Sequence, residues 1–412
     1  MTGTLVVVGG SLAGLRAVEA VRGDGWQGSV VLVGAEEHLP YDRPPLSKGY
    51  LSAAGCADPT YRDEHRLTHE LGVELMLGTP ASGLDVEART VAVGEREVGY
   101  DALVLATGSY ARELPGTEGL GGVFTLRTLD DARALRAALR EGSPRLTVVG
   151  GGFIGSELAS AGRALGLDVT LVERSPTLLV RAIGVSMGEA LTRLHERRGT
   201  RVLTGVHVEE VLGEGRVRAV RLSDGSEIGT DVLVAGVGAA PCTGWLEGSG
   251  LTVDDGVVAD AKLAAAPRVH VAGDIARWPN ALFDDVLDGP MRLQHWTTAA
   301  EQGARAARNA IAPERAQPYE TVPYFWSDWY SSRIQFVGVC GAGTHEVHVE
   351  VVAGDPADGG PFTALYRAND RIIGALAVDM RAEVMKYRRL IGQRARWATA
   401  VEFAETRRRK AG

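Results

Sequence analysis

The segment from Leu146 to Glu173 constrains the fold of this chain more than any other stretch. It begins with a short apolar run, Leu146 to Val149, of the length of one buried strand. Three glycines follow in G-x-G-x-x-G spacing, then a helix-like stretch from about Ile154 to Leu165 and a second apolar run that ends on Glu173. This order of strand, glycine turn, helix, strand and acid predicts a dinucleotide-binding βαβ unit.

Each residue of this fingerprint has a physical role. Gly150 allows the tight turn out of the strand, and Gly152 lets the backbone approach a pyrophosphate. Gly155 lets the helix pack closely on the sheet, and free backbone N–H groups at the start of the helix can bind the anion. Glu173 can accept hydrogen bonds from a ribose diol. Glycine is abundant here, so the glycine spacing is convincing only because all the other parts accompany it.

A second fingerprint lies at the start of the chain. Leu5 to Val8 is the strand, and the glycine turn that follows carries Ser11 where the middle glycine is expected. A helix of about Leu12 to Arg22, a strand from Ser29 to Val33 and an acid at Glu36 complete the unit. Two fingerprints imply two nucleotide sites, and the common arrangement is one for FAD and one for NAD(P)H.

Composition narrows the class of protein. A chain of 412 residues is too long for one ordinary core, so two or three domains are expected. The net charge of −8 argues against a nucleic-acid binder, and no apolar run approaches the ~20 residues of a membrane span. Cys56, Cys242 and Cys340 are far apart and form no zinc or disulfide pattern. We therefore expect no metal site, and a cytoplasmic location.

Several further motifs resemble those of the flavin-dependent ferredoxin reductases, the family of putidaredoxin reductase and the reductase components of aromatic-ring dioxygenases. The most specific is PYDRPPLSK at Pro40 to Lys48, within a proline-rich segment, Leu39 to Leu51, that is expected to be a rigid loop and not a helix interior. Similar motifs are LRT at Leu126 to Thr128, VHVAGDI at Val269 to Ile275, QHWTTAAEQ at Gln294 to Gln302, and VPYFWSDWY from Val322. The resemblance covers almost the whole chain.

The resemblance and the two fingerprints together imply an α/β fold with three domains. An FAD-binding Rossmann-like domain, residues 1–109 and 239–318, would receive an NAD(P)H-binding Rossmann-like domain, residues 110–238, as an insertion. A C-terminal α+β domain, residues 319–412, would contain strands at Ile334 to Val339, Val347 to Val352, Phe362 to Arg367 and Ile372 to Val378, followed by a basic helix. A helix is also expected directly after Asp274.

The resemblance also implies the site residues. Lys48 would lie beside the flavin ring with Glu157 as its ion-pair partner, and these two are the catalytic candidates. Glu36 is expected at the adenosine ribose, because Ala35 stands where some relatives carry an acid. The FAD set is Gly9, Ser11, Leu12, Ala13, Gly14, Glu36, Arg43, Pro45, Lys48, Ala81, Ala106, Thr107, Gly108, Arg127, Gly273, Asp274 and Trp296. The NADH set is Gly150, Gly152, Phe153, Ile154, Gly155, Glu157, Glu173, Arg174, Gly236, Val237 and Gly238.

The implied activity is transfer of a hydride from NADH to FAD, followed by single-electron transfer to an iron–sulfur ferredoxin that feeds an oxygenase, with a haem monooxygenase as the candidate. Glu173 favours NADH over NADPH, although Arg174 could hold a 2′-phosphate. Arg305 and Arg308, three apart on an expected helix, are the candidate docking residues for an acidic ferredoxin, and the tail Arg407 to Lys410 is a weaker candidate.

Three alternatives remain open at this point. A disulfide reductase or NADH oxidase on the same scaffold needs a redox cysteine near the flavin, and Cys56 lies beyond the PYDRPPLSK segment without a partner. Direct reduction of oxygen or quinone is a second alternative. The third is a redox-sensing flavoprotein that acts by binding another protein.

Overall fold

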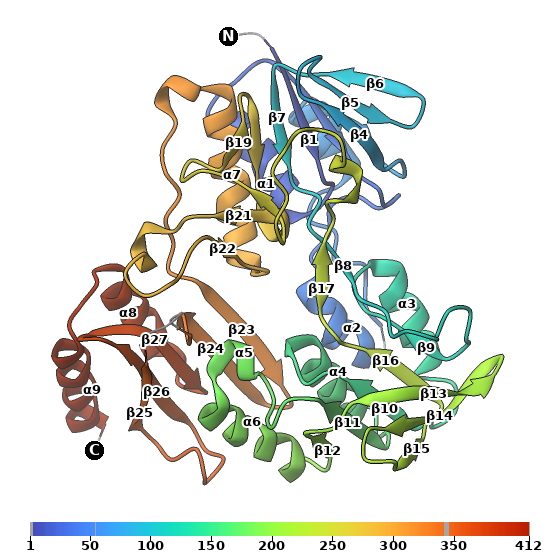
Figure 1. Ribbon diagram of the computed structural model, residues 1–412, viewed down its shortest axis with the longest axis vertical. Helices are drawn as coiled ribbons and strands as arrows, with labels where there is room; N and C mark the ends of the chain where they lie inside the picture. Colours follow the sequence, from blue (N-terminus) through green and yellow to red (C-terminus); the bar gives the residue numbers. More distant parts are fainter. Residues whose placement is uncertain (1–2, 54, 342–345, 412) are drawn as a thin grey trace. The chain divides into compact units, whose positions relative to one another are not determined.

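The structure is a computed structural model that describes residues 3–53, 55–341 and 346–411. The chain divides into two compact units (Figure 1), each built from segments that are far apart in the sequence. The first unit contains Met1–Asp42, Asp58–Tyr110 and Ala240–Pro323, and the second contains Arg43–Ala57, Ala111–Ala239 and Tyr324–Gly412. The expected NADH-binding and C-terminal segments thus belong to one unit, while the three-domain division stays a prediction.

The core of the first unit is a six-stranded sheet. From edge to edge its strands are β19 (Ala264–Ala266), β20 (Val269–Val271), β7 (Ala102–Leu105), β1 (Thr4–Val8), β2 (Ser29–Val33) and β3 (Val73–Met76). All neighbours run parallel except β19, which pairs antiparallel with β20. The central strands are almost continuously apolar and buried, which is typical of parallel strands covered on both faces.

Helices α1 (Leu12–Gly23) and α7 (Trp296–Ile311) pack against each other and against this sheet (Figure 1). The close approach depends on Gly303, because a Cβ atom there would overlap the carbonyl oxygen of Ala13. Two small sheets complete the unit: β4 (Ala81–Asp85), β5 (Thr90–Val93) and β6 (Arg96–Gly99), and β18 (Val257–Val258), β21 (Ala276–Trp278) and β22 (Met291–Arg292).

The part of the second unit that contains the expected NADH-binding segment repeats this plan. Its parallel sheet has the order β12 (Arg201–Thr204), β11 (Val169–Glu173), β10 (Leu146–Val149), β16 (Val232–Ala235) and β9 (Val123–Phe124). Its helices are α2 (Gly49–Ser52), α3 (Leu129–Ala138), α4 (Phe153–Ala164), α5 (Val180–Ile183) and α6 (Val185–Arg197). An antiparallel sheet of β13 (Val208–Glu214), β14 (Arg216–Leu222) and β15 (Glu227–Gly229) is attached to it.

The remainder of the second unit is an antiparallel sheet in the order β23 (Tyr324–Trp329), β24 (Ser332–Gly338), β27 (Arg371–Val378), β26 (Phe362–Ala368) and β25 (Val347–Ala353). Helix α8 (Arg381–Gly392) packs on β24 and β27, and α9 (Trp397–Ala411) contacts β25. Strand β23 contacts α4, and burial alternates along it, with Phe325, Ser327 and Trp329 buried. The remaining strands β8 (Ser109–Ala111) and β17 (Ala239–Pro241) contain points where the chain passes between the units.

The predicted fold class is confirmed, and two local predictions need correction. The proline-rich segment was expected to be a rigid loop. It contains instead a 3₁₀ turn at Pro44–Ser47 and the start of the short helix α2. The helix expected after Asp274 is absent there: a 3₁₀ turn at Gly273–Ile275 leads directly into β21. Strand β21 pairs with β22, and Pro279 disfavours a helical conformation for the residue before it.

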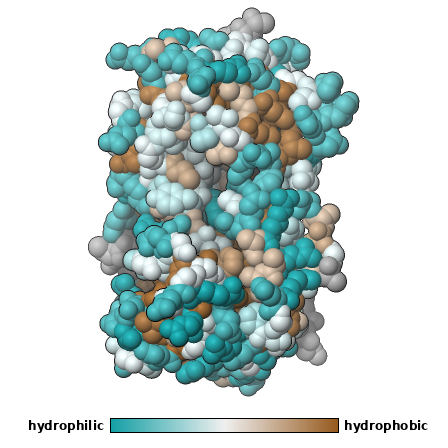
Figure 2. Space-filling view, turned by 90° about the vertical axis from the view of Figure 1, so that its right-hand side faces the viewer, coloured by the Kyte–Doolittle hydropathy of each residue, from teal (hydrophilic) through white to brown (hydrophobic). Residues whose placement is uncertain are grey.

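The surface in Figure 2 is predominantly hydrophilic, and its hydrophobic residues gather in separate patches. Among the described residues, no helix combines the length and the apolar character needed to cross a bilayer.

Candidate active site

The glycine turn of the second unit is shaped by two close backbone approaches. Gly150 has φ +104°, and a Cβ atom on it would overlap the carbonyl oxygen of Gly236 in the turn after β16. A Cβ atom on Gly155 would overlap the carbonyl oxygen of Gly150. At Gly152, the N-cap of α4, a Cβ atom would meet nothing within 4 Å. No side chain caps this helix, so the N–H groups of its first turn are available to bind a phosphate.

The other predicted NADH residues surround this turn. Glu173 accepts hydrogen bonds from the backbone nitrogen atoms of Gly151 and Ser175, both at 2.6 Å. Ile154 and Val237 are exposed aliphatic residues, 42% and 37% exposed. The turns that carry them touch through Gly150 and Gly236, so these two side chains offer apolar surface near the expected nucleotide. Arg174 is exposed.

The first unit repeats this construction around its own glycine turn. Gly9 has φ +132°, and a Cβ atom on it would overlap the carbonyl oxygen of Ala106, at the end of β7. A Cβ atom on Gly14 would overlap the carbonyl oxygen of Gly9. Ser11 is the N-cap of α1, and its side chain makes no capping hydrogen bond. The turn therefore brings the predicted FAD residues Gly9 to Gly14 and Ala106 to Gly108 together.

A third predicted segment of the first unit, Gly273 and Asp274, is fixed by polar contacts. Ser109 donates a hydrogen bond of 2.8 Å to Oδ2 of Asp274, and the backbone nitrogen of Gly273 donates one of 2.9 Å to Oε1 of Gln302. Gln302 is fully buried, and its Nε2 atom has no hydrogen-bond partner among the described residues. An orphaned buried amide is costly in a folded protein, and a bound group would satisfy it.

The side chain of Trp296, the first residue of α7, is fixed by hydrogen bonds from its indole nitrogen. It donates to Oδ1 of Asp42 at 2.8 Å and to the hydroxyl of Tyr61 at 3.0 Å, and Tyr61 donates to the same Asp42 oxygen at 2.6 Å. Burial and the hydrogen bond to Asp42 raise the pKa of Tyr61 well above its ordinary value, so it stays a neutral donor. Burial lowers the pKa of the neighbouring His295 to about 4, although Asp274 acts in the opposite direction.

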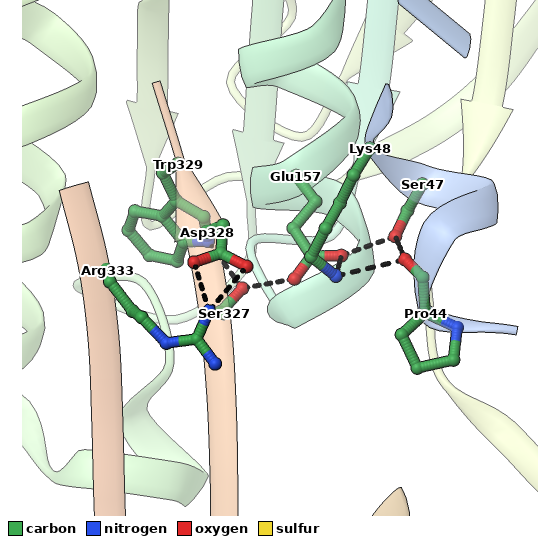
Figure 3. A network of polar contacts seen from close by, with 8 residues as sticks. All are labelled: Pro44, Ser47, Lys48, Glu157, Ser327, Asp328, Trp329 and Arg333. Carbon is green, nitrogen blue, oxygen red and sulfur yellow. Dashed lines mark hydrogen bonds and ion pairs between the residues drawn. The ribbon is translucent and has the colours of Figure 1, made fainter. Parts of the chain in front are cut away.

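The two catalytic candidates meet in the second unit. Nζ of Lys48 lies 2.8 Å from Oε2 of Glu157 and 3.1 Å from the carbonyl oxygen of Pro44 (Figure 3). Glu157 is 3% exposed on α4, whereas Lys48 is 20% exposed and follows the 3₁₀ turn that contains Pro45. The short turns of the proline-rich segment thus aim a lysine at a buried acid on a different element.

The remaining predicted FAD residues are more dispersed. Arg43 of the second unit donates to the carbonyl oxygen of Arg127, which lies just before the capping box that begins α3. In the first unit, Glu36 accepts a hydrogen bond of 2.5 Å from the hydroxyl of Tyr41. Ala81 is the first residue of β4.

These residues fit the two nucleotides that the motifs imply. Each unit has a glycine turn with tight backbone approaches and an uncapped helix start, and the first unit adds the orphaned Gln302 amide. Within 3–53, 55–341 and 346–411, no cluster of His, Cys, Asp or Glu is suited to hold a metal ion.

Comparison with known proteins identifies the family. Residues 3–303 match the family described as pyridine nucleotide-disulphide oxidoreductase, and residues 324–408 match the family described as reductase C-terminal. The chain belongs to the pyridine nucleotide-disulphide oxidoreductase family.

Similar proteins narrow this assignment. This chain is 36% identical over 396 residues to the anthranilate 1,2-dioxygenase system ferredoxin–NAD(+) reductase component of Burkholderia cepacia, covering 94% of this chain and 93% of that protein. It matches the structure of a covalent putidaredoxin reductase–putidaredoxin complex with a TM-score of 0.88 and 29% identity, covering 95% of this chain and 93% of that one. It also matches the structure of a ferredoxin reductase for the CYP199A2 system from Rhodopseudomonas palustris, with a TM-score of 0.88 and 30% identity, covering 95% of each chain. The predicted family of ferredoxin reductases is confirmed.

Several polar residues of the reductase were not predicted from its sequence. Ser47 and Ser327 both donate hydrogen bonds to Glu157, and Asp42 and Tyr61 hold Trp296. One signal was available for Ser327: it stands between Phe325 and Trp329 at a buried position of an alternating strand, where a hydroxyl needs a partner. Tyr61 carried no such signal, because it lies far from every motif.

Proposed function

We propose that this reductase transfers a hydride from NADH to bound FAD and passes the electrons singly to an iron–sulfur ferredoxin of an oxygenase system. The observation that carries the proposal is the ion pair between Lys48 and the buried Glu157 in a chain with two dinucleotide-type glycine turns. When bound, FAD supplies the exchange between a two-electron hydride donor and one-electron acceptors. Two relatives, the ferredoxin reductase components of the anthranilate and p-cumate dioxygenase systems, support a ferredoxin as the partner.

The proposed role of Lys48 is to present a positive charge where negative charge develops on hydride transfer. A largely buried ammonium group is unstable without compensation. Glu157 supplies that compensation at 2.8 Å, and the carbonyl oxygen of Pro44 adds a second acceptor. Three rotatable donors on the ammonium leave one N–H that neither Pro44 nor Glu157 occupies, and it can point toward a bound ring. The pair therefore acts in our proposal as a fixed electrostatic element.

We further propose that NADH is preferred to NADPH. Glu173 ends β11, and both its oxygens are oriented by backbone N–H groups, so its charge is fixed beside the glycine turn. A carboxylate in this place suits a ribose diol and repels a 2′-phosphate. The exposed Arg174 is the residue that opposes this preference.

The chain offers little for a dithiol mechanism. The three cysteines, all within the described residues, form no disulfide. Burial raises the pKa of the Cys340 thiol to about 11, which disfavours the reactive thiolate, and its Sγ atom donates to the carbonyl oxygen of Arg181. Cys56 is exposed. These observations favour transfer to an external one-electron acceptor over a redox-cysteine mechanism.

The test is steady-state oxidation of NADH by the purified yellow protein with a panel of [2Fe–2S] ferredoxins and cytochrome c as the final acceptor. Cytochrome c reduction that depends on ferredoxin is expected. NADH oxidation at the same rate without ferredoxin would instead identify an oxidase, and no NADH oxidation with any acceptor would favour a redox-sensing role. Adding either an aromatic-ring dioxygenase or a haem monooxygenase to the active ferredoxin then identifies the oxygenase class.

A further inference from the structure

Both oxygens of the Glu157 carboxylate are occupied by donors from different parts of the chain. Oε2 accepts a hydrogen bond from the hydroxyl of Ser47 and pairs with Lys48 (Figure 3). Oε1 accepts a hydrogen bond from the hydroxyl of Ser327 on β23. The lysine side of the network comes from the proline-rich segment, whereas Ser327 comes from the C-terminal sheet.

The direction of the Ser327 hydroxyl is determined by Trp329, two residues along the same face of β23. The indole Nε1–H of Trp329 lies 2.8 Å from Oγ of Ser327 (Figure 3). An indole nitrogen can only donate, so Oγ of Ser327 must accept this hydrogen bond. The single hydroxyl proton of Ser327 is then available for Glu157, and the chain of donors runs from Trp329 to Ser327 to the carboxylate.

Trp329 is itself immobilised on elements of the expected NADH-binding segment of the same unit. Its side chain is fully buried, and its ring lies 4.6 Å from the ring of His195 on α6. Nδ1 of His195 is 2.7 Å from the hydroxyl of Tyr330, whose backbone nitrogen donates to Oγ of Ser160 at 2.6 Å. Ser160 is three residues after Glu157 on α4, so the end of β23 is tied to the helix that carries the acid.

We propose that Ser327, oriented by Trp329, is a positioning residue that fixes the Glu157 carboxylate toward Lys48. The C-terminal sheet would thereby take part in hydride transfer through the buried acid. This inference deepens the proposed function and rests on it, because it assumes that the Lys48–Glu157 pair acts during reduction of the flavin. Ser327 does not itself touch the reacting groups.

The first test is the rate of flavin reduction by NADH, followed by stopped-flow bleaching in the holoenzyme. Ser327→Ala removes the donor with little change in volume and should slow reduction about 10-fold, the effect of losing one hydrogen bond to a charged group. Ser327→Thr keeps a hydroxyl and should restore the rate to within about 3-fold of wild type. The matched control is Ser332→Ala, which removes a buried serine from the neighbouring strand β24 without touching Glu157.

The second test separates positioning from a purely structural role. If Ser327 acts only through the acid, Ser327→Ala should produce less than about a 2-fold further loss when Glu157→Gln is already present. A full additional 10-fold loss on that background would overturn the proposal, and so would a Ser327→Ala variant with a wild-type rate.

A third test needs neither NADH nor turnover. The chain has seven tryptophans, so ¹⁵N-indole labelling gives few resonances. The resonance of Trp329 is identified by its loss in Trp329→Phe. It should shift in Ser327→Ala and also in Glu157→Gln, because the acid is the final acceptor of the donor chain, and it should stay in place in Lys262→Met, a change in the first unit. A Trp329 resonance with the same chemical shift in Glu157→Gln as in wild type would contradict the chain of donors.

The outcomes also separate this inference from the proposed function. Wild-type protein that fails to oxidise NADH with every acceptor tested would refute the proposed function. The indole spectra would still decide whether Trp329, Ser327 and Glu157 are linked by hydrogen bonds. An active wild type that is slowed by Lys48→Met but not by Ser327→Ala would refute the positioning role alone.

Discussion

Nζ of Lys48 lies 2.8 Å from Oε2 of Glu157, and the carboxylate is almost completely buried while the lysine side chain is 20% exposed. Removing one partner of such a pair leaves a buried charge without compensation, so single substitutions should be more harmful than the loss of one attractive contact. The pair also connects the proline-rich segment with α4, which are distant in sequence.

The Lys48→Met variant should retain FAD and reduce it more slowly. Loss of about 1.4 kcal/mol of transition-state stabilisation gives about a 10-fold decrease in the rate constant. Stopped-flow bleaching at saturating NADH measures this directly, with Lys262→Met, an exposed lysine of the first unit, as the control. Bleaching of Lys48→Met at the wild-type rate would show that the pair has no role in hydride transfer.

The sequence predicted the nucleotide-binding strands well because glycine turns and short apolar runs are local signals. Strand β2 has the expected bounds, and α4 begins at Phe153, one residue before the expectation. The Lys48–Glu157 contact was predicted from the family resemblance, not from spacing. The hydroxyl groups of Ser47 and Ser327 on Glu157 were missed, because such contacts depend on tertiary packing that no local pattern encodes. The same limit explains the absent helix after Asp274, where pairing of β21 with β22 decides the conformation.

Glu173→Gln should change the choice of nicotinamide cofactor. Glutamine has the size of glutamate, but its single side-chain oxygen cannot replace both acceptors of the Gly151 and Ser175 N–H groups. We expect kcat/KM for NADH to fall about 10-fold and kcat/KM for NADPH to fall less, because the repulsion of a 2′-phosphate is removed. The exposed Glu189 of α6, changed to Gln, serves as the control. An unaltered ratio of the two kcat/KM values would remove Glu173 from the selectivity mechanism.

Two buried histidines, His195 and His270, and the partly buried His295 should make the folded state sensitive to acid. Burial lowers the pKa of His195 to about 3, and it lowers the pKa values of His270 and His295 to about 4. Between these values and the ordinary 6.5 the unfolded chain binds protons that the folded chain does not, so stability falls as pH falls below about 6.5. Each histidine should lower the free energy of unfolding by about 2 kcal/mol at pH 5 relative to pH 7.5.

The measurement is the change in Tm between pH 7.5 and pH 5.0. His195→Phe keeps a flat ring against Trp329 and removes the titration, so its Tm should depend less on pH than that of wild type. His270 and His295 remain, and some dependence therefore persists. An identical pH dependence in both proteins would show that His195 is already protonated or solvated in the folded state. The exposed His348, changed to Phe, is the control.

Ferredoxin docking should depend on Arg305 more than on Arg308, although both lie on α7. Nε and Nη2 of Arg308 bind Asp24 at 2.6 and 3.0 Å, and this hydrogen-bonded pairing raises the pKa of the guanidinium group. The charge of Arg308 is thus largely compensated within the chain. Arg305 is half-buried and forms no ion pair with any residue that the structure describes. Arg305→Glu should raise the KM for an acidic ferredoxin about 10-fold, the effect of about 1.4 kcal/mol.

The salt dependence provides the independent check on this docking prediction. Turnover with ferredoxin should fall as ionic strength rises from 0.1 to 1 M, because the Debye length shrinks from ~10 to ~3 Å. Turnover of the same enzyme with ferricyanide, which needs no docking surface, should change less, and the salt effect on ferredoxin turnover should be weaker in Arg305→Glu than in wild type. Arg308→Glu should chiefly lower Tm, since it places a second carboxylate against Asp24. An Arg305→Glu variant with an unchanged ferredoxin KM, or with equal losses for both acceptors, would exclude this residue from the docking surface and leave the tail that begins at Arg407 as the next candidate.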